Sequence, residues 1–187
     1  MSSRGYIFKV VVVGDGAVGK TSLVMHFTEQ KFSSQYIMTI GSNFALKLIP
    51  SETLSTKEKM YPDTRLQLWD LAGQPHFKSV RFPFYKGSSG IIFVYDVTRE
   101  PTLGHLRGWR DEILKTVPED TPSVIMANKI DLVDERVINE EQGRELVKEF
   151  GSAGYFETSA KEGTNVNAGF QTLARAILDR MPDPEED

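Results

Sequence analysis

The stretch Gly14-Asp15-Gly16-Ala17-Val18-Gly19-Lys20-Thr21 follows directly after the apolar run Ile7–Val13. It fits the pattern G-x-x-x-x-G-K-[ST], in which a glycine-rich turn joins a strand to a helix and directs backbone N–H groups around a polyphosphate. In such a turn Lys20 reaches the terminal phosphates and the Thr21 hydroxyl binds Mg²⁺. Glycine is expected where a Cβ atom would collide with the ligand. The predicted phosphate contacts are Asp15, Gly16, Ala17, Val18, Gly19, Lys20, Thr21 and Ser22.

A second motif, Asn128-Lys129-Ile130-Asp131, follows the apolar stretch Val124–Ala127. It therefore lies at the exit of a predicted buried strand, where open α/β sheets bind ligands. The Asp131 carboxylate can accept hydrogen bonds from guanine N1–H and N2–H₂, whereas adenine offers an acceptor at N1 and nothing at C2. Sites of this type reject the wrong partner by about 10⁴ or more. We expect Asn128 to tie the base to the phosphate loop and the stem of Lys129 to cover one face of the ring.

A third candidate for the base site is Thr158-Ser159-Ala160-Lys161, which follows the apolar pair Tyr155-Phe156. The backbone N–H of Ala160 is placed to donate to guanine O6. Ser159 and Lys161 are expected to lie beside it against the nucleotide.

The segment Asp70-Leu71-Ala72-Gly73-Gln74 follows Leu66–Trp69, whose alternating pattern predicts a strand that ends at Asp70. Asp70 is expected in the Mg²⁺ shell. Gly73 can approach a γ-phosphate through its N–H, and Gln74 can orient the attacking water, as phosphoryl transfer by positioning requires. Gln74, Gly73 and Lys20 are therefore candidate catalytic residues.

These four motifs occur in the order and at the spacing of one family, and over residues 6–180 the chain resembles the Ras-superfamily small GTPases, most closely the Rab branch. The segment Tyr36–Gly41 is similar to the first switch of that family. The resemblance implies that Thr39 binds Mg²⁺ and assists catalysis, and that Tyr36 contacts the nucleotide. Phe32 matches the aromatic residue that packs against guanine in relatives.

The resemblance implies a GTP-binding switch with GTP or GDP and Mg²⁺ as cofactors, slow hydrolysis of GTP to GDP and phosphate, and Rab-like control of trafficking. Effectors, an exchange factor and an activating protein would bind the switch regions through the aromatic residues Phe44, Trp69 and Phe84, which are equally plausible as core residues. We expect a monomer. A nucleotide-binding adaptor with negligible hydrolysis stays open as an alternative, and a P-loop kinase or ATPase is a more distant one.

Composition agrees with one GTPase domain over residues 1–187, with flexible ends at residues 1–5 and 182–187. The chain has 187 residues, 40% of them apolar, and can bury a core without disulfides. A net charge of −4 leaves no basic footprint, so we expect no nucleic-acid partner. No apolar run reaches transmembrane length, and zero cysteines exclude a thiolate metal site and fit a reducing, cytoplasmic location.

The fold class predicted is α/β: a wound P-loop NTPase-type sheet of six mostly parallel strands with helices on both faces. The resemblance implies the strand order 2-3-1-4-5-6. Apolar segments predict strands at Ile7–Val13, Phe44–Ile49, Leu66–Trp69, Ile91–Tyr95, Val124–Ala127 and Tyr155–Phe156. Helical patterns cover Lys20–Gln30, Thr102–Val117, Glu140–Phe150 and Val166–Arg180, and Asn139 precedes the third of them as a capping box would.

Two departures from the family bear on hydrolysis. Pro75 follows Gln74 where relatives usually carry Glu, and a proline restricts the residue before it to extended backbone. We therefore expect slower hydrolysis than in a Pro75→Glu variant. The first switch has no Arg between Lys31 and Gly41, so an arginine for the transition state must come from a partner.

Two further departures bear on partners. The segment Pro50–Pro62 is longer than the usual link between the second and third strands, and its polar composition predicts an exposed hairpin tip or a partner epitope that uses Leu54, Met60 or Tyr61. The tail Met181–Asp187 has four acidic residues and no cysteine, so this chain has no cysteine lipid anchor. Membrane association would then need partners or a tail beyond this chain.

Overall fold

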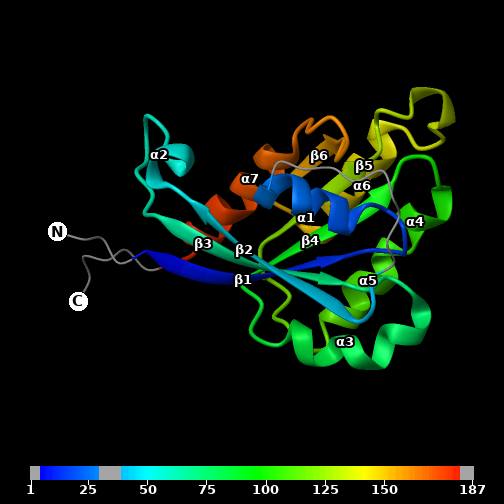
Figure 1. Ribbon diagram of the computed structural model, residues 1–187, viewed down its shortest axis with the longest axis horizontal. Helices are drawn as coiled ribbons and strands as arrows, with labels where there is room; N and C mark the ends of the chain where they lie inside the picture. The colour runs from blue at the N-terminus through cyan, green and yellow to red at the C-terminus, as the bar shows by residue number, and fades with distance from the viewer. Residues whose placement is uncertain (1–4, 30–38, 182–187) are drawn as a thin grey trace.

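Six strands form one sheet in the order β2-β3-β1-β4-β5-β6 in the computed structural model, which describes residues 5–29 and 39–181 (Figure 1). Only β2 runs antiparallel to its neighbour, and the other four pairings are parallel. The predicted strand order and fold class are therefore confirmed. The strands are β1 Tyr6–Val13, β2 Ser42–Ile49, β3 Thr64–Leu71, β4 Gly90–Asp96, β5 Ser123–Asn128 and β6 Gly154–Thr158.

Helices cover both faces of this sheet. They are α1 Lys20–Glu29, α2 Ser51–Leu54, α3 Lys78–Tyr85, α4 Glu100–Gly104, α5 Leu106–Ile113, α6 Glu140–Phe150 and α7 Val166–Leu178, with the 3₁₀ turns η1 Pro75–Phe77 and η2 Val133–Glu135. One core cluster joins α1 and α7 to the sheet and includes Phe27 and Phe170. The other joins α3, α5 and α6 to the opposite face and includes Tyr85, Trp109 and Phe150.

The central strands explain why sequence patterns found the sheet. Every residue of β4 and of β5 is buried, as expected of parallel strands covered on both faces. The edge strand β2 instead alternates, with Phe44, Leu46 and Leu48 exposed. At their carboxyl ends β1, β3, β4, β5 and β6 meet at one edge of the sheet, and this edge carries the candidate site.

Two helices were predicted within a residue or two of their observed bounds, and α6 begins with the expected capping box, in which Asn139 and Gln142 exchange side-chain to backbone hydrogen bonds. The helix predicted over Thr102–Val117 is in fact two, α4 and α5, separated at His105. Pro101 starts α4 early, and Gly104 precedes the break. The remaining prediction, Lys20–Gln30, agrees with α1 as far as the described residues extend.

The prediction of an exposed segment at residues 50–62 is confirmed for Glu52, Thr53 and Thr56–Met60 but is wrong for Leu54 and Tyr61. Residues Ser51–Leu54 form α2, Leu54 is fully buried, and Tyr61 is 8% exposed. The Arg175 side chain on α7 donates to the carbonyl oxygens of Leu54 and Thr53, at 2.8 and 3.2 Å. The insertion therefore packs onto its own domain, and of the three predicted contacts only Met60, 76% exposed, faces solvent.

Helix α3 was not predicted. Pro83 lies inside it, and a proline in the interior of a segment argues against a helix. No helix among the described residues is long and apolar enough to cross a bilayer. The ends expected to be flexible lie outside the described residues, apart from Gly5.

Candidate nucleotide site

The phosphate loop leaves β1 at Val13 and enters α1 at Lys20, as predicted. Gly14 and Gly19 have φ angles of +144° and +102°, which side chains rarely adopt. A Cβ atom on Gly14 would lie 2.1 Å from the Val94 carbonyl oxygen, and one on Gly19 would lie 2.2 Å from Asn128 Nδ2. These glycines are thus required by packing of the protein itself, whereas the sequence suggested only collision with a ligand.

Lys20 is 5% exposed, and its Nζ donates to the carbonyl oxygens of Gly14 and Asp15, both at 2.8 Å. Burial lowers the pKa of Lys20 to about 8, against the opposing effect of the nearby Asp70 and Asp15 carboxylates. A neighbouring anion stabilises a buried ammonium group that is bound only to neutral carbonyls, because the low dielectric of the interior strengthens the attraction between the two charges. The loop therefore fits a phosphate group beside Lys20.

Three oxygen-bearing side chains meet at the carboxyl end of β3. Thr21 Oγ1 donates to Asp70 Oδ2, and Thr39 Oγ1 lies 2.9 Å from Thr21 Oγ1 and 3.4 Å from Asp70 Oδ2. The other carboxylate oxygen, Asp70 Oδ1, is buried without a hydrogen-bond partner. Burial raises the pKa of Asp70, although the lysine and the two threonines oppose the change.

This donor set fits Mg²⁺. Magnesium prefers oxygen ligands and is usually held by one or two carboxylates together with substrate phosphates and water. A cation here would take up the unpartnered Asp70 Oδ1. Among the described residues no three His, Cys, Asp or Glu side chains gather into a metal site.

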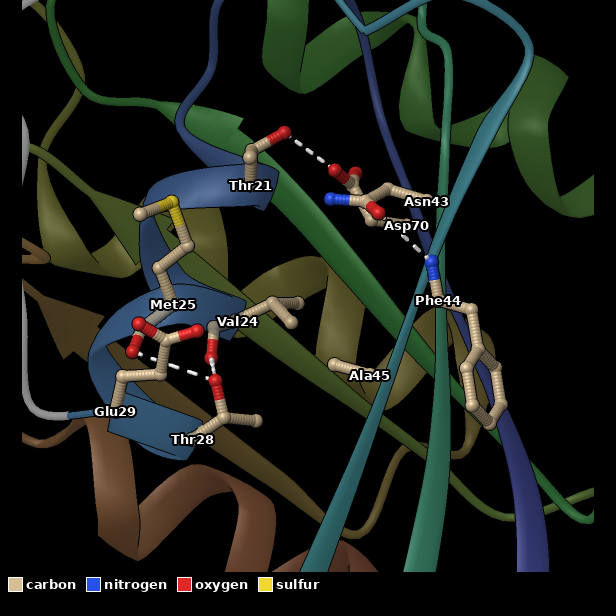
Figure 2. Close-up of a pocket in the computed structure, with 9 residues that line it drawn as sticks. All are labelled: Thr21, Val24, Met25, Thr28, Glu29, Asn43, Phe44, Ala45 and Asp70. Carbon is tan, nitrogen blue, oxygen red and sulfur yellow. Dashed lines mark hydrogen bonds between the residues drawn. The ribbon is translucent and has the colours of Figure 1, made fainter.

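Figure 2 shows Thr21 and Asp70 facing each other at one end of a cavity of about 170 Å³ between α1 and β2. Met25 and Thr28 line its α1 side, and Phe44 lies beyond Asp70 on β2. Two of the predicted metal ligands, Thr21 and Asp70, therefore line this cavity.

Gly73 and Gln74 lie directly against the phosphate loop. A Cβ atom on Gly73 would come within 2.4 Å of Asp15 C, Gly14 O and Gly16 N, so only glycine fits there. The Gln74 side chain lies over Gly16, where an added Cβ would be 3.5 Å from Gln74 Nε2. Gln74 Oε1 is buried without a partner. The residue is extended, with φ −72° and ψ 142°, as the following proline requires.

Asn128 joins the second motif to the phosphate loop. Its Nδ2 donates to the Val18 carbonyl oxygen at 2.9 Å, and its Oδ1 accepts from Thr158 Oγ1 and Ala160 N at 3.1 and 3.2 Å. The Ala160 N–H, predicted to donate to guanine O6, thus donates to Asn128 in this structure. Three segments far apart in the sequence converge on one amide side chain.

Asp131 and Lys129 also have partners within the site. Asp131 Oδ1 accepts from Ser159 Oγ at 2.7 Å, which links the second and third motifs. Lys129 has a φ of +72°, and its Nζ lies 2.7 Å from Asp96 Oδ2. Burial would raise the pKa of Asp96, but hydrogen bonds from Lys129 and Thr98 outweigh it and hold that pKa below its usual value. Lys161 is exposed at the rim.

Several residues of the site were missed by the sequence analysis. Asp96 is the last residue of β4 and Asp70 is the next to last of β3, and this shared position near a strand end is the signal that would have found Asp96. Arg99 Nη2 donates to the Gly16 carbonyl oxygen at 2.8 Å. Trp109 is 6% exposed, and its Nε1 donates to Asp15 Oδ1 at 2.9 Å, while His105 Nδ1 lies 2.6 Å from Asp15 Oδ2.

The three aromatic residues proposed as a partner surface do lie together. The ring centroids of Phe44 and Trp69 are 5.0 Å apart, and those of Trp69 and Phe84 are 5.3 Å apart. Phe44 is half exposed, whereas Trp69 and Phe84 are partly buried. The predicted nucleotide contacts Phe32 and Tyr36 lie outside the described residues.

Comparison with known proteins agrees with this geometry. Residues 9–179 match the family model described as Ras family. The chain is similar to "Ras-related protein Rab-7a" of Dictyostelium discoideum, with 41% identity over 183 residues that cover 95% of this chain and 85% of the relative. It is 40% identical to "Ras-related protein Rab7" of Pisum sativum over 185 residues, with the same coverage. It is 36% identical to "Ras-related protein Rab-8B" of Pongo abelii over 176 residues, covering 94% of this chain and 81% of the relative.

Proposed function

Because the chain belongs to the Ras family of small GTPases, which bind GTP or GDP with Mg²⁺ and hydrolyse GTP, we propose which of its residues perform each step. The chain is a Rab-like GTP switch, and we propose that it acts in membrane trafficking, as the names of its relatives suggest. Family membership supports the hydrolysing switch over the alternative of an adaptor with negligible hydrolysis.

The proposed nucleotide contacts combine the loop and the two base motifs. They are Asp15, Gly16, Ala17, Val18, Gly19, Lys20, Thr21, Ser22, Phe32, Tyr36, Thr39, Gly73, Asn128, Lys129, Asp131, Ser159, Ala160 and Lys161. The bond from Asn128 to Val18 carries this proposal, because it holds the base motif against the phosphate loop at 2.9 Å. One nucleotide would then contact the base motif through its guanine and the phosphate loop through its phosphates.

The metal and catalytic roles follow from the donor groups. Thr21, Thr39 and Asp70 would hold Mg²⁺, which supplies charge stabilisation to the phosphates when bound. Lys20 would neutralise the terminal phosphates, Gly73 would offer its N–H, and Gln74 would orient the attacking water. Gln74 supports this role by its position over Gly16 with a buried Oε1 that has no partner.

The partner surface is proposed at Phe44, Trp69 and Phe84. Rab-type GTPases bind effectors, exchange factors and activating proteins, and the three adjacent, partly exposed rings would supply an apolar contact area. An activating partner would contribute the arginine that residues 31–41 lack. Monomeric state, a cytoplasmic location and membrane association through partners stay predictions.

Base selection is the sharpest test of the proposed function. Calorimetry on nucleotide-free protein should give GTP binding at least about 10⁴-fold tighter than ATP. Asp131→Ala should weaken GTP and leave ATP unchanged, so that the preference collapses. The matched control is Asp134→Ala in the same loop, an exposed aspartate outside the proposed contacts, which should alter neither affinity. A preference for GTP that survives Asp131→Ala would overturn the proposal.

A further inference from the structure

Arg81 on α3 is a buried arginine whose donors serve two different parts of the fold. It is 3% exposed. Its Nη1 donates to the carbonyl oxygens of Ala72 and Gln74, at 2.9 and 3.1 Å. Its Nε and Nη2 donate to the two carboxylate oxygens of Glu112 on α5, at 3.1 and 3.2 Å. The same guanidinium thus binds the main chain on both sides of Gly73 and a carboxylate on α5, a helix that packs against the sheet.

Glu112 is held in place by more than this ion pair. Glu112 is 6% exposed, and its carboxylate also accepts a hydrogen bond from the Tyr85 hydroxyl at 2.6 Å. Burial, together with that hydrogen bond, raises the pKa of Tyr85 well above its usual value, so the phenol stays protonated and donates. A planar guanidinium that meets a carboxylate with two parallel bonds has little rotational freedom. Arg81 is therefore a rigid anchor for the segment it holds.

Trp109 connects the same anchor to the phosphate loop. The Arg81 guanidinium carbon lies 4.2 Å from the Trp109 ring centroid, and the indole N–H donates to Asp15 Oδ1 at 2.9 Å. Both α3 and α5 lie on the lower side of the sheet in Figure 1. Glu112 and Trp109 on α5 thus support both the segment that carries Gln74 and the phosphate loop. The Gln74 side chain lies between these two segments, because it packs over Gly16 of the loop.

We propose that Arg81 is a positioning residue for GTP hydrolysis, which fixes the main chain of Ala72 and Gln74 so that the Gln74 side chain stays aimed at the phosphate loop. Glu112 and Trp109 hold Arg81 in the required orientation. This inference rests on the role proposed above for Gln74. A lysine at this position would keep a charge beside Glu112 but could not reproduce the fork of bonds to two carbonyls and a carboxylate.

The test is a kinetic cycle between Arg81 and Gln74, measured as single-turnover hydrolysis in protein loaded with GTP. Arg81→Ala should slow hydrolysis by about 10- to 100-fold, because small misplacements of a catalytic group have effects of that size. Arg81→Lys should give an intermediate rate with the fold retained. In a Gln74→Ala background, Arg81→Ala should slow hydrolysis by less than about twofold, since Arg81 acts through Gln74.

A second readout does not depend on turnover. In protein loaded with GDP, Arg81→Ala should speed amide hydrogen exchange within residues 72–80 and leave that of β5 unchanged. The matched control is Arg175→Ala, which removes another arginine that donates to two carbonyl oxygens but lies on α7. It should alter neither the hydrolysis rate nor the exchange of residues 72–80.

The outcomes separate this inference from the proposed function. If Gln74→Ala leaves hydrolysis unchanged, the proposed role of Gln74 is wrong and the inference fails with it. If Gln74→Ala slows hydrolysis but the losses from Arg81→Ala and Gln74→Ala multiply, Arg81 does not act through Gln74 and only the inference is overturned. Faster exchange throughout the protein in Arg81→Ala and in Arg81→Lys would mean that Arg81 only stabilises the fold, which also overturns it.

Discussion

The side-chain amide of Asn128 donates a 2.9 Å hydrogen bond to the carbonyl oxygen of Val18, which lies 110 residues earlier in the sequence. Both groups are buried, and Asn128 Oδ1 is also fully occupied by Thr158 and Ala160. One side chain therefore holds the phosphate loop and both base motifs in a fixed relation.

We expect Asn128→Ala to speed GDP dissociation by about 5- to 150-fold, because each buried group left without a partner costs about 1–3 kcal/mol. Stopped-flow release of a fluorescent GDP analogue measures the rate. Asn139→Ala, which removes a helix cap remote from the nucleotide, is the control and should leave GDP release unchanged. Equal release rates for Asn128→Ala and the wild type would contradict the expectation.

Gly16→Val should slow hydrolysis by at least about tenfold, because its methyl groups would displace the Gln74 side chain from the loop. An alanine Cβ at this position would sit 3.5 Å from Gln74 Nε2, an ordinary contact, so Gly16→Ala should have a smaller effect. Gln74→Leu removes the amide proposed to orient the attacking water, so it should also slow hydrolysis and keep the protein bound to GTP. Single-turnover assays decide the matter, and undiminished hydrolysis in Gly16→Val or Gln74→Leu would refute it.

Pro75→Glu should raise the intrinsic hydrolysis rate by roughly 3- to 10-fold. Gln74 is held at φ −72° and ψ 142° before the proline, and replacing Pro75 lets it reach backbone conformations that the proline ring excludes. Pro75→Ala separates release of the backbone from the added carboxylate and should give a similar increase. If all three proteins hydrolyse GTP at the same rate, the proline has no kinetic effect.

Leu54→Ala should reduce the free energy of unfolding by about 2–5 kcal/mol, because Leu54 is fully buried beside α7 and its loss leaves a cavity. Met60→Ala in the same insertion should change stability by less than about 0.5 kcal/mol, since Met60 is 76% exposed. Urea unfolding measures both, and GTP affinity should be unaltered in each. Comparable stability of the two variants would show that the insertion does not pack as described.

Glu157→Gln should lower stability by about 1 kcal/mol near neutral pH, where Arg136 pairs with the partly exposed carboxylate. The hydrogen bond from Arg136 holds the pKa of Glu157 below its ordinary value of 4.5. The folded state therefore binds fewer protons than the unfolded state as pH falls below 4.5, and the stabilisation present above that pH is lost through the folded pKa. The free energy of unfolding of the wild type and of Glu157→Gln should be measured from neutral to acidic pH, and the difference between them should shrink as the pH falls. A difference that stays constant would rule out the ion pair as its source.

The insertion at residues 50–62 illustrates where sequence reasoning reaches its limit. Its polar composition is typical of an exposed loop, yet Leu54 and Tyr61 are buried because α7 lies beside them. The Tyr61 hydroxyl donates to Asp179 Oδ1 at 2.9 Å, across 118 residues. A local pattern carries no information on which distant element will cover it.

The sequence by itself determined the sheet, its layering and the chemistry of the nucleotide site. Apolar runs such as Val124–Ala127 predict buried strands, and the carboxyl ends of parallel strands meet at one edge whatever their connections. The motifs that begin at Gly14 and Asn128 predict a phosphate and a guanine ligand, because of the hydrogen bonds that these residue types can make. These are local properties, written in consecutive residues.

Tertiary structure alone decided how the site is held together. Arg81 is polar and lies on a helix that the sequence analysis did not predict, so the local pattern gives no sign that it binds the main chain of Ala72 and Gln74. Trp109 reads as a core residue, and only the packing of α5 brings its N–H to Asp15. Trp109 lies 94 residues from Asp15 in the sequence and Arg81 lies 31 residues from Glu112, so these contacts form only once the helices have packed on the sheet.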